Sequence, residues 1–81
     1  MQKYNQAYQV IKRVILDIIP DLSQDMIVPD MSMKDLNLSS IDRMDVVVES
    51  MMILKIKVPN QVIVKANNIG ELAHIFSQYI S

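Results

Sequence analysis

Two adjacent serines, Ser39 and Ser40, precede a run of apolar and acidic residues that begins at Ile41. A serine hydroxyl at the start of a helix lies among backbone N–H groups without intrahelical partners, at the positive end of the helix dipole. Helix N-termini bind phosphate through these donors, so a phosphoester there is stabilised. We therefore expect the covalent chemistry at Ser40. The simpler alternative is a helix cap, because Ser39 and Asp42 have the spacing of a loose capping box.

Charged side chains follow Ser40 at helical spacing. The acids Asp42, Asp45 and Glu49 recur every three or four residues, which places them along one face of a helix. We expect this face to meet partner proteins, the simpler alternative being a solvated polar face. Arg43 lies one turn after Ser40, where it can contact a phosphate or a partner carboxylate.

The same segment is rich in methionine. Met44, Val48, Met51 and Met52 can form an adaptable surface, because methionine side chains repack against different partners. Core packing is the alternative that helical spacing favours for Met44 and Met51, whereas Met52 falls on a different part of the helix. The residues that we expect to bind partners are Ile41, Asp42, Arg43, Met44, Asp45, Val48, Glu49 and Met52.

Residues for other kinds of site are scarce. The chain has no cysteine and one histidine, which excludes disulfides, thiolate ligands and a histidine-based metal site. His74 has Glu71 and Gln78 beside it on a helical wheel and no accompanying nucleophile, so we expect it on the surface. Gly70 is the only glycine, so there is no glycine-rich phosphate loop. We expect neither a catalytic residue nor a metal, and hence not an enzyme.

Length and composition bound the class of protein. Residues 1–81 make one domain, and the apolar fraction of 51% with a single glycine favours a folded, mostly helical chain. No apolar run approaches the ~20 residues of a membrane span, and the N-terminal segment does not resemble a secretory signal. We expect a cytoplasmic monomer that does not bind membranes.

Charge is uneven along the chain, although the net charge is −1. Residues 1–15 carry +3, residues 16–50 carry −6 and residues 51–81 carry +2. The acidic segment contains Ser40, which favours a basic partner surface and disfavours nucleic acid as a ligand. An ordinary solvated run of charge is the alternative.

Hydrophobic periodicity predicts the elements that hold Ser40. Apolar residues at helical spacing predict an amphipathic helix over residues 3–19, which Pro20 ends. A long loop over residues 20–38 follows, in which Ser32 and Asp35 can cap a single turn. The loop side chains that we expect to contact the core are Met26, Ile27, Val28, Met31, Met33 and Leu36.

Two further helices are predicted after the loop. One extends from Ser40 to about Leu54, with apolar residues at positions 41, 44, 47, 48, 51 and 54, and part of its wide apolar arc must face outward. The last follows a capping box at Asn68 and Glu71. Its apolar stripe comprises Ile69, Leu72, Ile75, Phe76, Tyr79 and Ile80. For residues 55–66, local propensity favours a β-hairpin around Pro59, although an isolated hairpin is marginal in water.

The segment 35–44 resembles the Gly-x-Asp-Ser-Leu neighbourhood of acyl carrier proteins, in which the serine carries 4′-phosphopantetheine. Ser40 takes the place of that serine and Ile41 that of the leucine. Asn37 stands where the family usually has glycine and tolerates a left-handed turn, while Ser39 replaces the aspartate and keeps its capping function. The resemblance covers most of the chain, including the first and last helices and Pro59.

The resemblance implies an all-α fold, a small four-helix bundle with a long loop between helices one and two and a short third helix near residues 60–66. It implies a covalent arm from coenzyme A on Ser40, and as partners a phosphopantetheinyl transferase and a ketosynthase or acyltransferase. The runs 40–43 and 68–73, with Asp45, are most similar to freestanding carriers of polyketide β-branching cassettes, which donate acetyl units to a hydroxymethylglutaryl-synthase-like enzyme. A general fatty-acid or polyketide carrier, a carrier for another acyl group and a helical interaction module without the arm remain alternatives.

Overall fold

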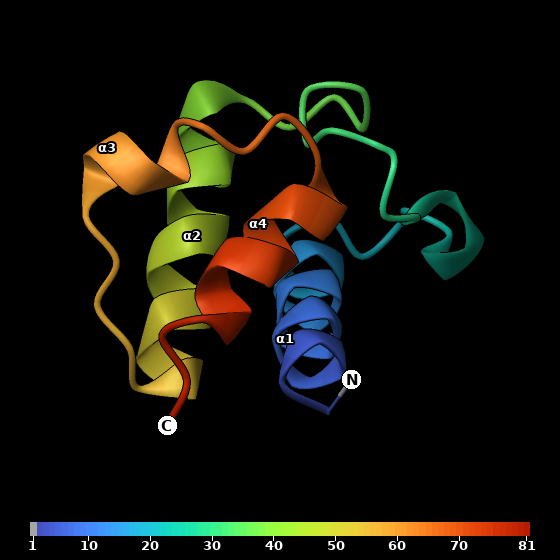
Figure 1. The fold of residues 1–81 in the computed structure, drawn as a ribbon. Coiled ribbons are helices and arrows are strands. Elements are labelled where there is room, and N and C mark those ends of the chain that lie inside the picture. The colour runs from blue at the N-terminus through green and yellow to red at the C-terminus, as the bar shows by residue number, and fades with distance from the viewer. Residues whose placement is uncertain (1) are drawn as a thin grey trace.

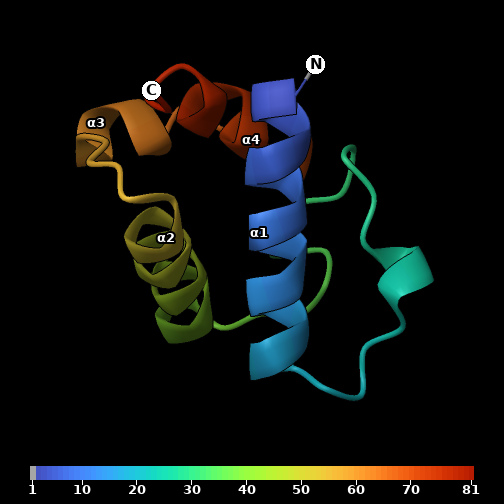
Figure 2. The same cartoon turned by 90° about the horizontal axis from the view of Figure 1, so that it is seen from below.

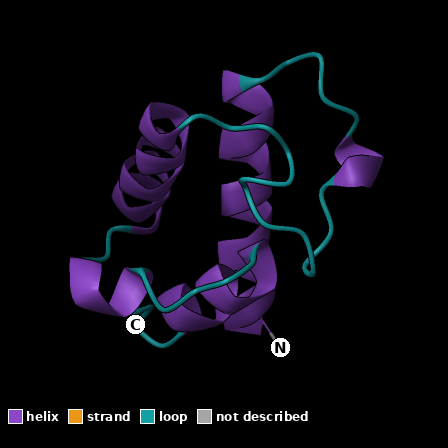
Figure 3. Cartoon of the chain, turned by 90° about the horizontal axis from the view of Figure 1, so that it is seen from above, coloured by secondary structure: helices purple, strands orange, loops and turns teal. Residues whose placement is uncertain are grey.

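The computed structural model describes residues 2–81 as helices joined by loops (Figures 1 and 3). Its elements are α1 (Gln2–Ile18), the 3-10 helix η1 (Gln24–Met26), α2 (Ser40–Leu54), α3 (Asn60–Ile63) and α4 (Ile69–Ser77). No strand occurs in residues 2–81, so the hairpin that local propensity favours at residues 55–66 is wrong. The all-helical prediction is confirmed, and the short α3 lies within the predicted range.

Helix α1 is central to the packing. It packs against both α2 and α4, and it runs beside α2 in the opposite direction (Figure 2). Its buried side chains, Ala7, Ile11, Val14 and Ile15, recur at three- and four-residue spacing and form one stripe. The amphipathic helix predicted from this spacing is confirmed to within one residue at each end.

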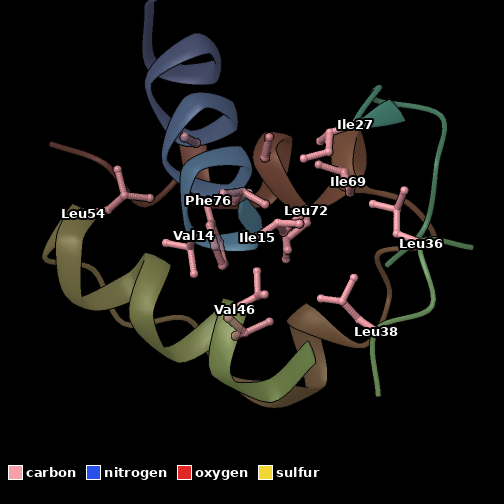
Figure 4. Close-up of a cluster of buried hydrophobic side chains, with 14 of the residues drawn as sticks. Val14, Ile15, Ile27, Leu36, Leu38, Val46, Leu54, Ile69, Leu72 and Phe76 are labelled. Atoms are coloured by element: carbon pink, nitrogen blue, oxygen red, sulfur yellow. The ribbon is translucent and has the colours of Figure 1, made fainter. Parts of the chain in front are cut away.

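The core lies where α1, α2, α4 and the long loop meet. Figure 4 shows Val14 and Ile15 of α1 directed toward Val46 of α2, with Phe76 and Leu72 of α4 beside them. Phe76 is fully buried, and it is the largest side chain in that state. Burial of such apolar surface is the main favourable term for a chain of this size.

The long loop between α1 and α2 is joined to the start of α4 by backbone hydrogen bonds. The Ile69 N–H donates to the Met31 carbonyl and the Gly70 N–H to the Pro29 carbonyl, both at 2.9 Å. Only glycine fits this approach, because a Cβ on Gly70 would lie 2.9 Å from the Pro29 Cβ. The loop thereby satisfies N–H groups that lack partners at a helix start.

Only part of the loop contacts the core as predicted. Ile27 and Leu36 are buried, as is Leu38, whereas Met31 and Met33 are partly buried. Met26 and Val28 are 52% and 42% exposed, so their predicted core contact is wrong. The reason is that η1 stands away from the helices, as Figure 1 shows, and carries Met26 with it.

One predicted capping box is confirmed in full and the other in part, because the Glu71 carboxylate accepts from the Asn67 N–H and not from that of Asn68. The Asp35 N–H donates to Ser32 Oγ at 3.0 Å, and the Ser32 N–H donates to Asp35 Oδ2 at 3.2 Å. At the start of α4, the Glu71 N–H donates to Asn68 Oδ1 at 2.7 Å. These local bonds fix where each turn begins.

The apolar stripe of α4 is confirmed only in part. Ile69, Leu72 and Phe76 are buried, and Ala73 joins them. The helix ends at Ser77, so Tyr79 lies beyond it and is 40% exposed, against the prediction. No helix in the described residues is both long enough and apolar enough to cross a membrane.

Candidate functional site around Ser40

A tight turn brings the chain to Ser40. Asn37 has a φ of 66°, the left-handed conformation for which its side chain is suited. The Leu38 N–H then donates to the Met33 carbonyl at 3.1 Å, and the Leu38 side chain is buried. The backbone leading into α2 is thus held on both sides of the turn, and Asn37 adopts the left-handed conformation that was expected of it.

Ser39 and Ser40 have different structural roles. Ser39 is the N-cap of α2, and its Oγ accepts a hydrogen bond from the Asp42 N–H at 3.1 Å. Ser40 is the first residue of α2 and is exposed. The capping interpretation is therefore correct for Ser39. The Ser40 hydroxyl does not cap the helix, and it lies at the positive end of the dipole of the fifteen-residue α2.

Helix α2 carries apolar side chains on two faces. The inner face, formed by Val46, Val47, Ser50 and Leu54, is buried in the core. The outer face consists of Ile41, Met44, Val48 and Met52, which are 74%, 55%, 41% and 72% exposed. Core packing of Met44, favoured by its spacing, is therefore wrong, whereas Met51 is partly buried against the core.

Acidic residues run beside this outer face. Asp45 and Glu49 are exposed, and Asp42 is half-buried. Each lies one residue from a member of the outer face, so the two rows run along the helix together. Seven of the eight expected partner-binding residues, Ile41, Asp42, Met44, Asp45, Val48, Glu49 and Met52, thus form one surface that begins beside Ser40.

Arg43 is placed differently from the other expected partner-binding residues. It is half-buried, and its Nε atom is buried without a hydrogen-bond partner. Its side chain lines a cavity of about 290 Å³ between the start of α2, the turn at residues 32–34 and the segment 63–69. The lining residues are Ser32, Met33, Lys34, Arg43, Val47, Ile63, Ala66, Asn67, Asn68, Ile69 and Leu72.

Sequence reasoning missed this cavity. Lys34, Asn67 and Asn68 come from segments far apart in the chain, and no periodicity or motif links them. Only Arg43 carried a usable signal, its position one turn after Ser40. The fold assembles the site by placing α3 and the segment after it beside the start of α2, as Figure 1 shows.

His74 lies at another cavity. It is exposed, as expected, and with Asp30 and Glu71 it lines a cavity of about 430 Å³ near the start of α4. Its Nε2 is 3.5 Å from the Gln78 side-chain nitrogen. Within residues 2–81 no three histidine or acidic side chains gather closely enough to hold a metal ion.

The residues around Ser40 suit a phosphate ester. The hydroxyl is exposed at a helix N-terminus, and a guanidinium with an unpartnered buried nitrogen lies one turn away. Comparison of the chain with protein-family models, curated proteins and solved structures found no match. The function therefore has to be inferred from this geometry and from the motif around Ser40.

Proposed function

We propose that the chain is an acyl carrier protein in which Ser40 bears a 4′-phosphopantetheine arm. The observation that carries the proposal is the division between Ser39, which caps α2, and Ser40, which is exposed as its first residue. The sequence 37–41, with Asn37 in a left-handed turn, further supports it. We also propose that the four helices and long loop form the bundle typical of such carriers.

Loading the arm requires one covalent step at Ser40. The Ser40 Oγ forms a bond to the phosphorus of the pantetheine-bearing phosphate of coenzyme A, and the pyrophosphate P–O bond breaks. Adenosine 3′,5′-bisphosphate leaves, and the serine proton passes to a base of the transferase. The dipole of α2 stabilises the anionic ester that results. When bound, the arm supplies a thiol that holds acyl groups as thioesters.

The surface along α2 would bind the enzymes that use the arm. Its apolar outer face with a row of acids fits an apolar depression rimmed by basic residues. The partners proposed are a phosphopantetheinyl transferase and then a hydroxymethylglutaryl-synthase-like enzyme, a ketosynthase or an acyltransferase. The chain would act as a cytoplasmic monomer, because a shuttle must leave one partner to reach the next.

Acetyl donation in polyketide β-branching is the specific role that the sequence favours. The run 40–43 with Asp45, and the run 68–73 at the start of α4, support it. Acetyl-loaded protein should support condensation by a hydroxymethylglutaryl-synthase-like enzyme, read as product mass on the acceptor. A general ketosynthase accepting the acetyl group while every such synthase fails would instead indicate an ordinary fatty-acid or polyketide carrier.

Intact-protein mass spectrometry tests the carrier proposal. The folded chain is incubated with coenzyme A and a broad-specificity phosphopantetheinyl transferase. The parent should gain one phosphopantetheinyl group, and Ser40→Ala should gain none. Ser39→Ala is the matched control and should still load, because it loses a cap and not the acceptor. Absence of a gain in the parent with several transferases would contradict the proposal.

A protein-interaction module without the arm is the second candidate, favoured by the exposed outer face of α2. Such a module would bind its partner equally well with Ser40 or with alanine at position 40. A carrier would instead lose acyl transfer completely in Ser40→Ala. The two functions therefore separate in the same variant.

A further inference from the structure

The exposed charges at the two ends of α2 have opposite signs. Asp42, Asp45 and Glu49 lie in the part of the helix that follows Ser40. Lys55 caps the other end, and Lys57 follows two residues later; both lysines are exposed. No acidic residue occurs in residues 50–70, so the segment that carries these lysines supplies no acid of its own. The surface along α2 therefore has an acidic start and a basic end.

Backbone contacts hold the two lysines at the end of α2. The Lys55 and Ile56 N–H groups both donate to the Met51 carbonyl, that of Ile56 at 3.0 Å. Ile56 is partly buried and Val58 is buried, so the chain is anchored to the core on both sides of Lys57. The backbone of both lysines is thus fixed relative to the helix, and the basic end is a constant part of this surface.

Exposed apolar side chains connect the acidic start to the basic end. Met44, Val48 and Met52 follow one another at four-residue spacing along the outer face of α2. Ile53, next to Met52, is 50% exposed. Protein interfaces commonly have such an apolar centre and a charged, solvent-accessible rim. The outer face of α2 therefore has the composition of one interface whose rim changes sign along the helix.

The acidic start and the basic end are far enough apart to act separately. An α-helix rises by about 1.5 Å per residue, so Lys55 lies about 9 Å beyond Glu49 and about 15 Å beyond Asp45 along α2. At physiological ionic strength, exposed charges more than about 8 Å apart are largely screened from each other. A partner group opposite Lys55 is therefore attracted by the lysines with little opposition from the acids, and each end needs its own complement.

We propose that Lys55 and Lys57 dock on an acidic patch of the partner enzyme, while the acids at the start of α2 meet its basic residues. The inference rests on the proposed function and adds that the docking site of the enzyme carries both signs of charge. A reversed approach would set the lysines against the basic residues and the acids against the acidic patch, which disfavours it. The polarity of the surface therefore selects the orientation in which Ser40 reaches the enzyme.

An anionic membrane is the other surface that binds lysines beside exposed apolar side chains. Such a membrane would attract Lys55 and Lys57, but it would repel Asp45 and Glu49 on the same helix because it carries one sign of charge. A protein surface can complement both ends of α2 at once. The charge pattern therefore favours a protein partner, and anionic vesicles serve as the contrasting probe.

Calorimetric titration of a hydroxymethylglutaryl-synthase-like enzyme with the folded chain, unloaded and loaded, tests the proposal. Lys55→Glu and Lys57→Glu should each raise Kd about tenfold, because they place an acid against the acidic patch. Lys57→Met should raise Kd by less, since it removes an attraction without adding a repulsion. Arg13→Glu, on the exposed side of α1, makes the same change of charge and should leave Kd unchanged. All of these variants should keep the helical circular dichroism and still load at Ser40.

An unchanged or lower Kd in Lys55→Glu and Lys57→Glu would overturn the inference, and it would leave the carrier proposal intact as long as the parent loads. Absence of binding to the synthase, to a ketosynthase and to an acyltransferase would overturn it as well. Vesicles of phosphatidylglycerol and phosphatidylcholine should not bind the parent; binding that these two variants abolish, without an effect at the enzyme, would assign the lysines to a membrane. A parent that shows the expected dependence on Lys57 but never loads would contradict the carrier proposal and support the docking surface alone.

Discussion

Helices α1 and α2 use their apolar residues differently. The fully buried residues of α1 form one stripe, and in the described part of α1 no large apolar side chain is exposed. Helix α2 instead buries Val46, Val47 and Leu54 and exposes a second apolar face. The fold therefore uses the apolar residues of α1 for packing and leaves an apolar face of α2 exposed to solvent.

The largest effect expected from this difference comes from one isoleucine on each helix. Ile11→Ala on α1 removes a fully buried side chain and should lower the free energy of unfolding by about 2–5 kcal/mol. Ile41→Ala on α2, where the side chain is 74% exposed, should change it by less than about 0.5 kcal/mol. Urea denaturation followed by circular dichroism measures both. A comparable loss in Ile41→Ala would mean that the outer face packs against the fold.

The inner face of α2 has its own irregularity in Ser50. This residue is fully buried, and its Oγ has no hydrogen-bond partner. Ser50→Ala should raise the free energy of unfolding by about 1–2 kcal/mol, because it removes an unsatisfied hydroxyl and introduces a residue with higher helix propensity. Thermal unfolding would record a higher midpoint. Destabilisation would show that the hydroxyl is satisfied in solution, by water or by its own helix.

On α1, the phenol of Tyr8 adds a polar contact to the loop. Its hydroxyl donates to the Ile27 carbonyl at 2.9 Å, and burial, with a smaller contribution from Tyr4, raises the pKa of Tyr8 above 10.0. Tyr8→Phe should cost about 1 kcal/mol at neutral pH. Because the pKa is raised in the folded state, this stability is present below pH 10 and is lost as pH rises through the folded value. Urea titrations across pH 8–11 should therefore show a smaller alkaline decline in the variant; equal declines would contradict this role.

The start of α2 offers a matched pair of serines. Ser39→Ala removes the N-cap bond to Asp42 and should lower the free energy of unfolding by about 1 kcal/mol. Ser40→Ala, one residue later, should leave it within about 0.5 kcal/mol of the parent. Thermal or urea unfolding of the two variants separates the structural serine from the exposed one. Equal losses would mean that both hydroxyls hold the helix.

The end of α2 should respond least. Lys55 has a φ of 57° and caps the helix through its N–H, which donates to the Met51 and Met52 carbonyls. Glycine adopts this conformation without strain, so Lys55→Gly should stabilise the chain by about 0.5–1 kcal/mol. The urea midpoint is the measurement. A lower midpoint would indicate that contacts of the lysine side chain stabilise the fold by more than the positive φ of Lys55 destabilises it.

Local signals in the sequence were enough for much of the fold. The spacing of Ile11, Val14 and Ile15 predicts α1, and the paired side chains of Ser32 with Asp35 mark a turn through bonds between near neighbours. The left-handed turn at Asn37 was expected from the position of a glycine in the family that the segment resembles, and asparagine tolerates that conformation. These features depend on residues within one or two turns of each other.

Features set by distant parts of the chain could not be read in this way. Val62, Ile63 and Val64 favour a strand locally, yet residues 2–81 contain no sheet for them to join, and Val64 is 75% exposed at the end of α3. On α2, two apolar faces overlap in one sequence pattern, so spacing alone did not decide that Met44 faces outward. Which face of α2 is buried depends on the side against which α1 packs.

The bonds from Pro29 and Met31 to the start of α4 divide the long loop into two parts with different tolerance to changes in length. Residues 20–26 precede these hydrogen bonds, so a glycine inserted after Ser23 would lengthen a surface segment of the loop and leave α1 and Pro29 in place. The same insertion after Met33 would fall between two fixed points and displace Leu38 and the serine pair. Chains with this architecture should therefore vary in length before Pro29 and keep a constant spacing from Pro29 to Ser40.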